Sequence, residues 1–405
     1  MRVLILSQYF WPETFRINEV AQSLRQAGCE VSVLTGQPNY PDGVTFQGYR
    51  AFAMGREEFA GCSVYRVPLA PRGRAGAVRL AVNYLSFVLG ASLLGPWLLR
   101  GQRFDVIFVY GISPILQAVP GIRLRRSTRG RLVTWVQDLW PQSLEVTGFV
   151  RNRGLLNCVA RIVRWIYRRS DLLLVQSRAF IPVVEAMSGG TPVRYHPNPG
   201  ELSFSQPAVA APAGVTDFEP GFNVVFAGNL GTVQALDTLL AAAELLLPNR
   251  EVHFVLVGSG SRGNWLMQEV ERRKLVNVRF VGRLAPEAMP AVLAKASVLL
   301  VSLVRSSIMS QTIPSKIQAY LAAGRPIVAC LDGEGARVVE EAGAGVTCPA
   351  EDANALARSI LQLQALPPEQ LSQMGNAGRC YYQKHFEPER LARELMERFT
   401  EVLST

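Results

Sequence analysis

The chain has 405 residues, of which 49% are hydrophobic and 18% are charged. This length exceeds one ordinary core and suits two domains of about 200 residues each, and the composition excludes a collagen-like or largely disordered protein. The net charge of +10 comes from the first half, because residues 1–200 hold 24 arginines, no lysine and 11 acidic residues. A basic half predicts an anionic partner: a nucleic acid, an acidic lipid surface or a phosphate compound.

In residues 1–196, short apolar segments alternate with longer amphipathic ones. The pattern predicts strands at 2–6, 31–35, 62–67, 105–109, 131–136 and 171–175, and helices at 14–27, 76–99, 113–125, 154–169 and 178–187. Such alternation is typical of a parallel sheet covered by helices. We therefore expect residues 1–196 to form one doubly wound α/β domain.

The loop after the first strand, SQYFWPETFRINE, has no glycine from Ser7 to Glu19. A dinucleotide pyrophosphate needs glycines at that point, so this is not a usual NAD domain. The loop instead carries candidate residues for gripping an acceptor sugar or its phosphate: Tyr9, Trp11, Glu13 and Arg16. The alternative is that the loop packs against its own domain.

Residues 80–99, LAVNYLSFVLGASLLGPWLL, are uncharged and long enough to span a bilayer. A span would put strands of one sheet on opposite sides of the membrane, so we reject it. Two interpretations remain. The segment is either a buried crossover helix, or a helix whose apolar face and Trp97 enter the lipid interface while flanking arginines contact anionic headgroups. These arginines are Arg72, Arg74, Arg79, Arg100 and Arg103.

The proline-rich residues 197–221 are predicted to form an interdomain linker. The alternation then resumes, with strands at 222–227, 252–257, 277–281, 297–302, 326–330 and 345–347 and terminal helices at 352–364, 368–384 and 387–403. This predicts a second doubly wound domain over residues 222–386, with the terminal segment 387–405 a candidate to pack back on the N-terminal domain. Two such domains facing each other would form a cleft at the carboxyl ends of their strands.

Three glycine turns of the second half each follow a predicted strand. Gly228, Asn229 and Gly231 precede a helix, whose first backbone amides suit a diphosphate. Gly258, Gly260 and Gly263 have the dinucleotide spacing, but the acidic residue expected about 20 positions later is missing. We therefore interpret this second turn as an anion-accepting turn beside Arg262. The third turn contains Gly333, Glu334 and Gly335.

The segment IPSKIQAYLAAGRPIVA places Ser315 and Lys316 at the start of a helix. A lysine at a helix N-terminus is a point charge well suited to a leaving diphosphate. Lys316 is thus the first candidate for a phosphate-binding residue.

The ordered motifs YFWPE, TGQPNYPDG, QDLWPQS, FAGNLG, VGSGS, PSKIQAYLAAGRPIVA and GEGARVVEEAGAGV resemble those of the family 4 retaining glycosyltransferases. These enzymes have the two-domain GT-B fold. The resemblance runs from residue 1 to about residue 390 and is greatest to enzymes of bacterial O-antigen and capsule assembly. Among these, the chain looks most similar to the N-acetyl-L-fucosamine transferases.

The resemblance implies roles for matching residues. Gly231 and Lys316 would hold the donor diphosphate, and the turn from Gly258 to Arg262 would lie near the nucleotide. The segment from Gly333 to Ala336 would present its amides to the donor sugar, and Glu334 would contact the sugar hydroxyls.

The chain also departs from the family pattern. Gln137-Asp138 stands where relatives often have His-Asp, so Asp138 becomes the candidate for orienting or deprotonating the acceptor hydroxyl; the alternative is that it only caps the next turn. Gln318 stands where many relatives have a ribose-binding Glu, and Ser310 replaces an earlier one. Asn229 and Gln234 replace the usual Arg and Lys, which leaves Lys316 with more of the phosphate charge.

The implied reaction moves a sugar from a UDP-sugar to a polyprenyl-diphosphate-linked acceptor, with retention of configuration. Lys316 and helix amides would stabilise the leaving diphosphate, so we expect no metal and no cofactor, in agreement with the absence of Asp-x-Asp. We expect a peripheral, monotopic protein on the cytoplasmic face of the bacterial inner membrane. Its expected partners are the UDP-sugar, the lipid-linked acceptor and an anionic membrane surface, and no nucleic acid.

Three other functions are possible interpretations of the same sequence pattern. A sugar-nucleotide 2-epimerase shares the fold but needs no lipid acceptor, so it leaves segment 80–99 and the basic half unexplained. A membrane-associated protein could bind nucleotide sugars without turnover. An NADP-dependent reductase would use the 258–263 turn and Arg283.

Overall fold

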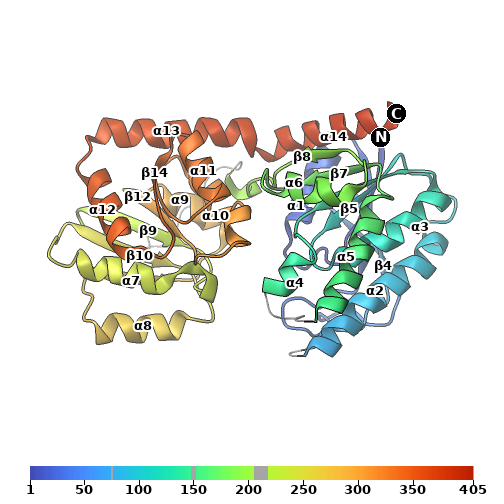
Figure 1. The fold of residues 1–405 in the computed structure, drawn as a ribbon, viewed down its shortest axis with the longest axis horizontal. Helices are drawn as coiled ribbons and strands as arrows, with labels where there is room; N and C mark the ends of the chain where they lie inside the picture. Colours follow the sequence, from blue (N-terminus) through green and yellow to red (C-terminus); the bar gives the residue numbers. More distant parts are fainter. Residues whose placement is uncertain (74–75, 147–151, 205–217, 405) are drawn as a thin grey trace. The chain divides into compact units, whose positions relative to one another are not determined.

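A computed structural model of the chain describes residues 1–73, 76–146, 152–204 and 218–404. Arg74 and most of the predicted linker 197–221 therefore lie outside the described residues. The chain forms two compact units, which we call unit 1 and unit 2 (Figure 1). Unit 1 consists of Met1–Pro199 together with Pro388–Thr405, and unit 2 consists of Gly200–Glu387.

Unit 1 is built on an eight-stranded sheet with the order β3-β4-β2-β1-β5-β6-β7-β8. All neighbouring strands are parallel except β3, which runs antiparallel to β4. The strands are β1 Arg2–Leu6, β2 Glu30–Gly36, β3 Gly55–Phe59, β4 Cys62–Val67, β5 Val106–Gly111, β6 Arg131–Val136, β7 Leu172–Val175 and β8 Val193–Tyr195.

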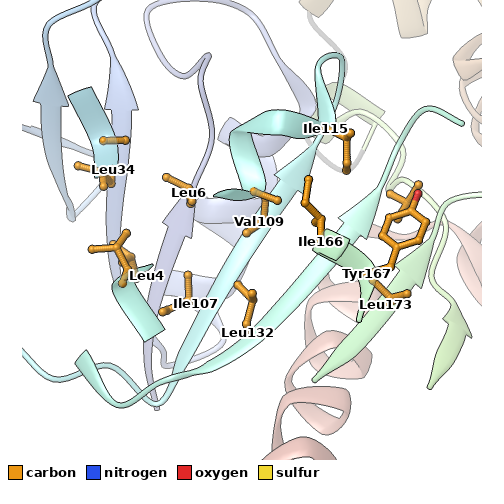
Figure 2. Close-up of a cluster of buried hydrophobic side chains, with 14 of the residues drawn as sticks. Leu4, Leu6, Leu34, Ile107, Val109, Ile115, Leu132, Ile166, Tyr167 and Leu173 are labelled. Atoms are coloured by element: carbon orange, nitrogen blue, oxygen red, sulfur yellow. The ribbon is translucent and has the colours of Figure 1, made fainter. Parts of the chain in front are cut away.

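Successive residues of the central strands point to opposite faces of this sheet. In β1, Leu4 and Leu6 enter one core, shown in Figure 2 beside Leu34, Ile107 and Val109. Val3 and Ile5 enter the core on the other face. Both faces are therefore buried, as the continuous apolar segments of these strands predict.

Helices cover both faces of the unit 1 sheet. They are α1 Arg16–Gln26, α2 Ala77–Leu98, η1 Ile115–Ala118, α3 Val119–Thr128, α4 Gln142–Val146, α5 Arg153–Tyr167, α6 Phe180–Ser188 and α14 Pro388–Ser404. The last helix, α14, belongs to the core that Val3 and Ile5 enter, and its Phe399 ring lies 5.3 Å from that of Phe108. The C-terminal segment thus completes the core of unit 1.

Two strands of unit 1 were not predicted. β3 has the sequence GREEF, with a single large apolar residue, and turns into β4 through Ala60 and Gly61, both at positive φ. Its charged residues suit an edge strand but mask the strand pattern. β8 has three residues, which is too short for a periodic signal.

Unit 2 has a six-stranded, entirely parallel sheet with the order β11-β10-β9-β12-β13-β14. Its strands are β9 Phe222–Ala227, β10 Val252–Val257, β11 Val278–Gly282, β12 Val298–Ser302, β13 Ile327–Cys330 and β14 Gly345–Cys348. Two hydrophobic cores lie on its two faces. The predicted fold class, two doubly wound Rossmann-like domains followed by C-terminal helices, is confirmed.

The helices of unit 2 connect and cover these strands. They are η2 Leu202–Phe204, η3 Thr232–Gln234, α7 Leu236–Leu245, α8 Gly263–Arg272, η4 Pro286–Ala288, α9 Met289–Leu293, η5 Met309–Gln311, α10 Ser315–Ala323, α11 Glu334–Glu341, α12 Ala353–Gln364 and α13 Pro368–His385.

Helix α2 contains the predicted apolar segment. The described part of the chain contains one helix that is long and apolar enough to cross a membrane. This helix is α2, and the apolar stretch is Val78–Leu98. The strands on either side of it in the chain, β4 and β5, belong to the same sheet, which agrees with the rejection of a span. Its Phe87 and Ala91 are buried against that sheet. Its opposite face carries exposed apolar side chains, which we call the α2 stripe: Val78, Val82, Leu85, Leu89, Leu93 and Trp97, each 50–78% exposed.

Candidate functional site

Unit 2 contains a cavity of about 670 Å³ at the carboxyl ends of its strands. Its wall comes from the segments that follow β9, β10, β11 and β12 and from the start of α10. This is the edge at which ligands bind in open parallel α/β sheets, and the volume suits a nucleotide-sized ligand. The polar and charged lining residues are Glu201, Asn229, Gln234, Ser259, Arg283, Thr312, Ser315, Lys316 and Tyr320.

Lys316 is the central cation of this wall. Its ammonium group lies 3.6 Å from the centre of the Phe226 ring and donates a hydrogen bond to Oε1 of Gln234. Among the described residues, no carboxylate forms an ion pair with it. Burial lowers the pKa of Lys316 to about 7, because a cation loses hydration inside the protein. The charged form of Lys316 is therefore poorly compensated in the free protein, and an anionic ligand would stabilise it.

The space for Lys316 is created by Gly228. This glycine has φ +133°, and a Cβ atom there would lie 2.6 Å from Cε of Lys316. Tyr320, one turn along α10, fixes the same region, because its hydroxyl accepts from Ala227 N at 2.9 Å and lies 3.2 Å from Leu300 O. The end of β9 and the start of α10 are thereby held together around the lysine.

Five of the predicted donor-binding residues line the cavity: Gly228, Asn229, Gly258, Ser315 and Lys316. The cavity wall also contains residues that were not among the predicted donor-binding residues: Arg283, Leu284, Met289, Leu293 and Leu303. The sequence could have indicated two of these residues. Arg283 and Leu284 directly follow β11, and the carboxyl ends of parallel strands lie at one edge of the sheet.

The second glycine turn serves loop packing. A Cβ atom on Gly258 would lie 1.9 Å from Gly228 O, and one on Gly260 would lie 2.5 Å from Leu230 O. Leu230 N also donates to Ser259 O at 2.9 Å. Glycines at 258 and 260 let the two loops interlock, so their spacing is not the mark of a dinucleotide site. Gly260 is absent from the cavity wall.

Arg262 and Gly231 are also absent from the wall. The Arg262 guanidinium pairs with Asp237 at 2.6 Å and lies 3.5 Å from the centre of the Trp265 ring. The side chain is therefore held away from the cavity wall, and its place beside the nucleotide stays a prediction. Gly231 precedes η3, and a Cβ atom there would lie 2.7 Å from Asn229 Nδ2.

Gln318 does not line the cavity, and its contact with ribose stays a prediction. On α10 the lining positions are Ser315, Lys316, Ala319 and Tyr320. Residue 318 lies about 200° around the helix from residue 316. Gln318 is accordingly buried on another face, with 3% of its surface exposed.

The segment from Gly333 to Ala336 lies outside the cavity wall. Glu334 begins α11 and its carboxylate accepts two hydrogen bonds of 3.0 Å from Arg337. A Cβ atom on Gly333 would lie 2.0 Å from Ser310 O, and one on Gly335 would lie 2.8 Å from Leu331 Cδ1. Both glycines are thus required by close packing. The contacts of this segment and of Glu334 with a donor sugar stay a prediction.

In unit 1, Asp138 follows β6 and is half-buried. Its Oδ2 accepts from Ser113 N at 2.9 Å and from Ser113 Oγ at 2.8 Å. Trp140 Nε1 donates to the same Ser113 hydroxyl at 3.0 Å. The carboxylate is therefore held through one oxygen, and its Oδ1 makes no hydrogen bond within the described part of the chain. Its role toward an acceptor stays a prediction.

The residues of the first loop mostly support its own domain. Glu13 is 1% exposed, and its carboxylate accepts from the backbone amides of Asn39 at 2.8 Å and Tyr40 at 2.7 Å. Burial raises the pKa of Glu13 to about 7, although these amide bonds oppose the shift. Tyr9 is buried and stacks on Phe15. Tyr9 and Glu13 thus support the loop within its own domain, and their contact with an acceptor sugar stays a prediction.

The other two residues of that group are more accessible. Arg16 pairs with Glu19 at 2.5 Å on the first turn of α1. Trp11 is 37% exposed. Of the four, Trp11 keeps a surface that an acceptor could contact.

Both halves of the chain match known protein families. Residues 14–201 match the glycosyl transferase 4-like domain, and residues 221–365 match the glycosyl transferases group 1. WbjE of Pseudomonas aeruginosa, named as a glycosyltransferase, is 25% identical over 80% of each chain. WcaI of Escherichia coli K12, named as a glycosyl transferase of colanic acid biosynthesis, is 25% identical over 98% of this chain and 99% of its own.

Solved structures show the same fold. Sucrose-phosphate synthase from Thermosynechococcus elongatus aligns with a TM-score of 0.74 and 18% identity, over 100% of this chain and 99% of that one. HepE from Anabaena, solved in complex with UDP and glucose, aligns with a TM-score of 0.67 and 16% identity, over 99% and 100%. The two family matches together cover most of the sequence, and the chain belongs to the GT-B glycosyltransferases of family 4, group 1, which transfer a sugar from a nucleotide sugar.

Proposed function

We propose that the protein transfers a sugar from a UDP-sugar to a polyprenyl-diphosphate-linked acceptor during synthesis of a bacterial surface polysaccharide, O-antigen or capsule. N-acetyl-L-fucosamine is the candidate sugar, on the resemblance of the motifs. WcaI is named for colanic acid biosynthesis and HepE was solved with UDP, which supports the polysaccharide and the nucleotide. The observation that carries the proposal is the half-buried Lys316, whose ammonium group faces the unit 2 cavity beside the Phe226 ring.

The chemistry of sugar transfer asks for such a cation. When the bond between the sugar and the diphosphate breaks, negative charge grows on the departing diphosphate, and a fixed positive group lowers the barrier. Lys316 can provide that charge once it exchanges Gln234 Oε1 for a phosphate oxygen. The apolar wall formed by Leu284, Met289 and Leu293 offers a surface for the nucleobase.

Asp138 is the proposed base for the acceptor. Ser113 holds its Oδ2 and thereby fixes the direction of Oδ1. A carboxylate oriented in this way can align an attacking hydroxyl group and accept its proton, provided the hydroxyl comes within hydrogen-bond reach.

Membrane attachment is proposed for the α2 stripe. It extends over about 28 Å of helix from Val78 to Trp97, and burying one leucine side chain contributes about 1.5–3 kcal/mol. Exposed arginines flank it at both ends, among them Arg79, Arg100 and Arg103. Each arginine adds about 1 kcal/mol near an anionic surface. We therefore propose a peripheral, monotopic protein at the cytoplasmic face of the inner membrane.

The reaction itself is tested with a panel of UDP- and GDP-sugars and a lipid-diphosphate-linked N-acetylglucosamine, analysed by mass spectrometry. We expect one donor to give transfer, and Lys316→Ala to lower kcat/KM by about 10²–10³-fold, as the loss of a transition-state contact does. The exposed Lys295 provides the matched control Lys295→Ala, which should retain activity. If no donor gives transfer or hydrolysis, or if Lys316→Ala stays near wild type, the proposal fails. A nucleotide sugar altered only in configuration would indicate a 2-epimerase.

Donor binding should depend on pH through Lys316. Its pKa of about 7 in the free protein means that it loses its proton as the pH rises further. A bound diphosphate raises this pKa, so binding above pH 7 must take up a proton and weakens by up to about tenfold per pH unit. Isothermal titration calorimetry with UDP, in buffers of different ionisation enthalpy between about pH 7 and pH 9, measures this uptake. Lys316→Arg should remove it, because arginine stays charged. A wild-type Kd that is flat over this range contradicts the assignment.

The membrane surface is tested by co-sedimentation with vesicles. Wild-type protein should bind vesicles rich in phosphatidylglycerol and bind less at high salt. Replacing Leu85, Leu89 and Leu93 with serine should weaken binding at least about 100-fold, because three apolar side chains no longer enter the lipid. Val276, 91% exposed on unit 2, gives the control Val276→Ser. Unchanged vesicle binding of the triple variant overturns the proposal. The proposal also fails if the wild-type protein is a dimer and the triple variant is a monomer, because the stripe would then be a dimer interface.

A further inference from the structure

Arg72 lies in unit 1, between the end of β4 and the start of α2. It is half-buried, and its guanidinium lies 5.2 Å from the centre of the Tyr40 ring. The Tyr40 ring is itself packed against Phe15, at 5.1 Å between centroids, and against Tyr9. The arginine therefore rests on a rigid aromatic platform at a surface that Tyr40 leaves 37% exposed.

A buried amide network fixes the backbone on which Arg72 stands. Arg72 N donates to Asn39 Oδ1 at 3.1 Å, and Asn83 Nδ2 donates to Ala70 O at 2.7 Å. Asn83 Oδ1 in turn accepts from Gln8 Nε2 at 2.8 Å. Because Asn83 belongs to α2, these bonds hold Arg72 beside the first turns of that helix, where the α2 stripe begins.

The charge of Arg72 is not neutralised locally. In the part of the chain that the structure describes, it forms no ion pair with a carboxylate. The nearby carboxylates accept hydrogen bonds from other groups. Glu13 accepts from two backbone amides, and Asp138 accepts from Ser113. An arginine that is held in place and lacks a counter-charge is well suited to an external anion.

Tyr84 connects this arginine to the proposed base. Burial raises the pKa of the Tyr84 hydroxyl, the positive charge of Arg72 lowers it and the negative charge of Asp138 raises it. Tyr84 is thus close enough to both groups to sense their charges. Hydrogen bonds connect the same elements: Gln8 joins Asn83, the residue before Tyr84, to Gln117. Gln117 Nε2 donates to Ile112 O, next to the Ser113 that holds Asp138.

We propose that Arg72, with the hydroxyl groups of Tyr40 and Tyr84, binds the diphosphate of the lipid-linked acceptor. The guanidinium fork matches phosphate oxygens, and the phenols add neutral donors. The polyprenyl chain then lies along the α2 stripe, and the sugar hydroxyl reaches toward Asp138. This inference rests on the proposed function, since it assumes a lipid-linked acceptor.

The test compares two acceptors that carry the same sugar, one on a short alkyl diphosphate and one on a neutral alkyl glycoside. With donor saturating, Arg72→Gln should raise KM for the diphosphate acceptor about tenfold or more, the loss expected for a charge-assisted contact. KM for the neutral glycoside and the rate of donor hydrolysis without acceptor should stay unchanged. Arg56→Gln is the matched control, because Arg56 lies 5.3 Å from the centre of the Tyr65 ring on the same unit; it should behave as wild type with both acceptors.

Three results would overturn the inference. One is an equal effect of Arg72→Gln on both acceptors, which would indicate a structural role. Another is no effect on either acceptor. The third is a loss of binding to phosphatidylglycerol vesicles as large as the rise in KM, which would make Arg72 a general headgroup contact. If wild-type protein instead uses no lipid-linked acceptor at all, the proposed function has failed, and that outcome is distinct from these three.

Discussion

The half-buried ammonium group of Lys316 and its few polar contacts are the feature on which the unit 2 site depends. Moving a cation out of water costs several kcal/mol unless an anion or several hydrogen bonds replace the lost hydration. Here the replacement is one amide oxygen from Gln234 and the face of Phe226. Gly228 provides the space, and the Tyr320 hydroxyl ties together the strands and the helix around it. The cavity is thus organised around a charge that an anionic ligand would stabilise, and a nucleoside diphosphate is such a ligand.

Unit 1 shows a complementary constraint in helix α2. One face of the helix packs on the sheet through Phe87 and Ala91, and both ends of the helix lead into strands of that sheet. The helix therefore cannot leave the domain, yet its other face exposes an apolar stripe. A helix that only covered a sheet would carry polar residues there. An apolar stripe, a flanking set of arginines and Arg72, which forms no ion pair within the described residues, support the proposal that the protein works on a lipid-linked anion.

The sequence predicted the architecture well, because buried parallel strands read as continuous apolar segments and helices as longer amphipathic ones. Two strands were not predicted. β3 has charged residues that suit an exposed edge, and β8 has only three residues. Lys316 was found because its position at a helix start has a direct chemical meaning. Gln318 was predicted at the site, whereas helical periodicity places residue 319, not 318, on the face of Lys316, and Ala319 lines the cavity.

Other parts of the site depend on tertiary contacts that no local pattern contains. Glycines such as Gly260 looked like ligand contacts, but they are needed where two loops approach each other closely. Glu13 looked like a sugar contact, and the structure shows its carboxylate capped by amides from a loop more than 25 residues away. Arg262 was expected at the nucleotide and is held by Asp237 and Trp265. In each case the residue type was informative, and its partner could be learned only from the fold.

The most direct test of the central claim is a crystal structure of the protein with UDP bound. We expect the uridine diphosphate to occupy the unit 2 cavity, with Lys316 Nζ within hydrogen-bond distance of a phosphate oxygen and no longer bonded to Gln234 Oε1. UDP bound elsewhere, or bound in the cavity with Lys316 still on Gln234 and away from the diphosphate, would contradict it.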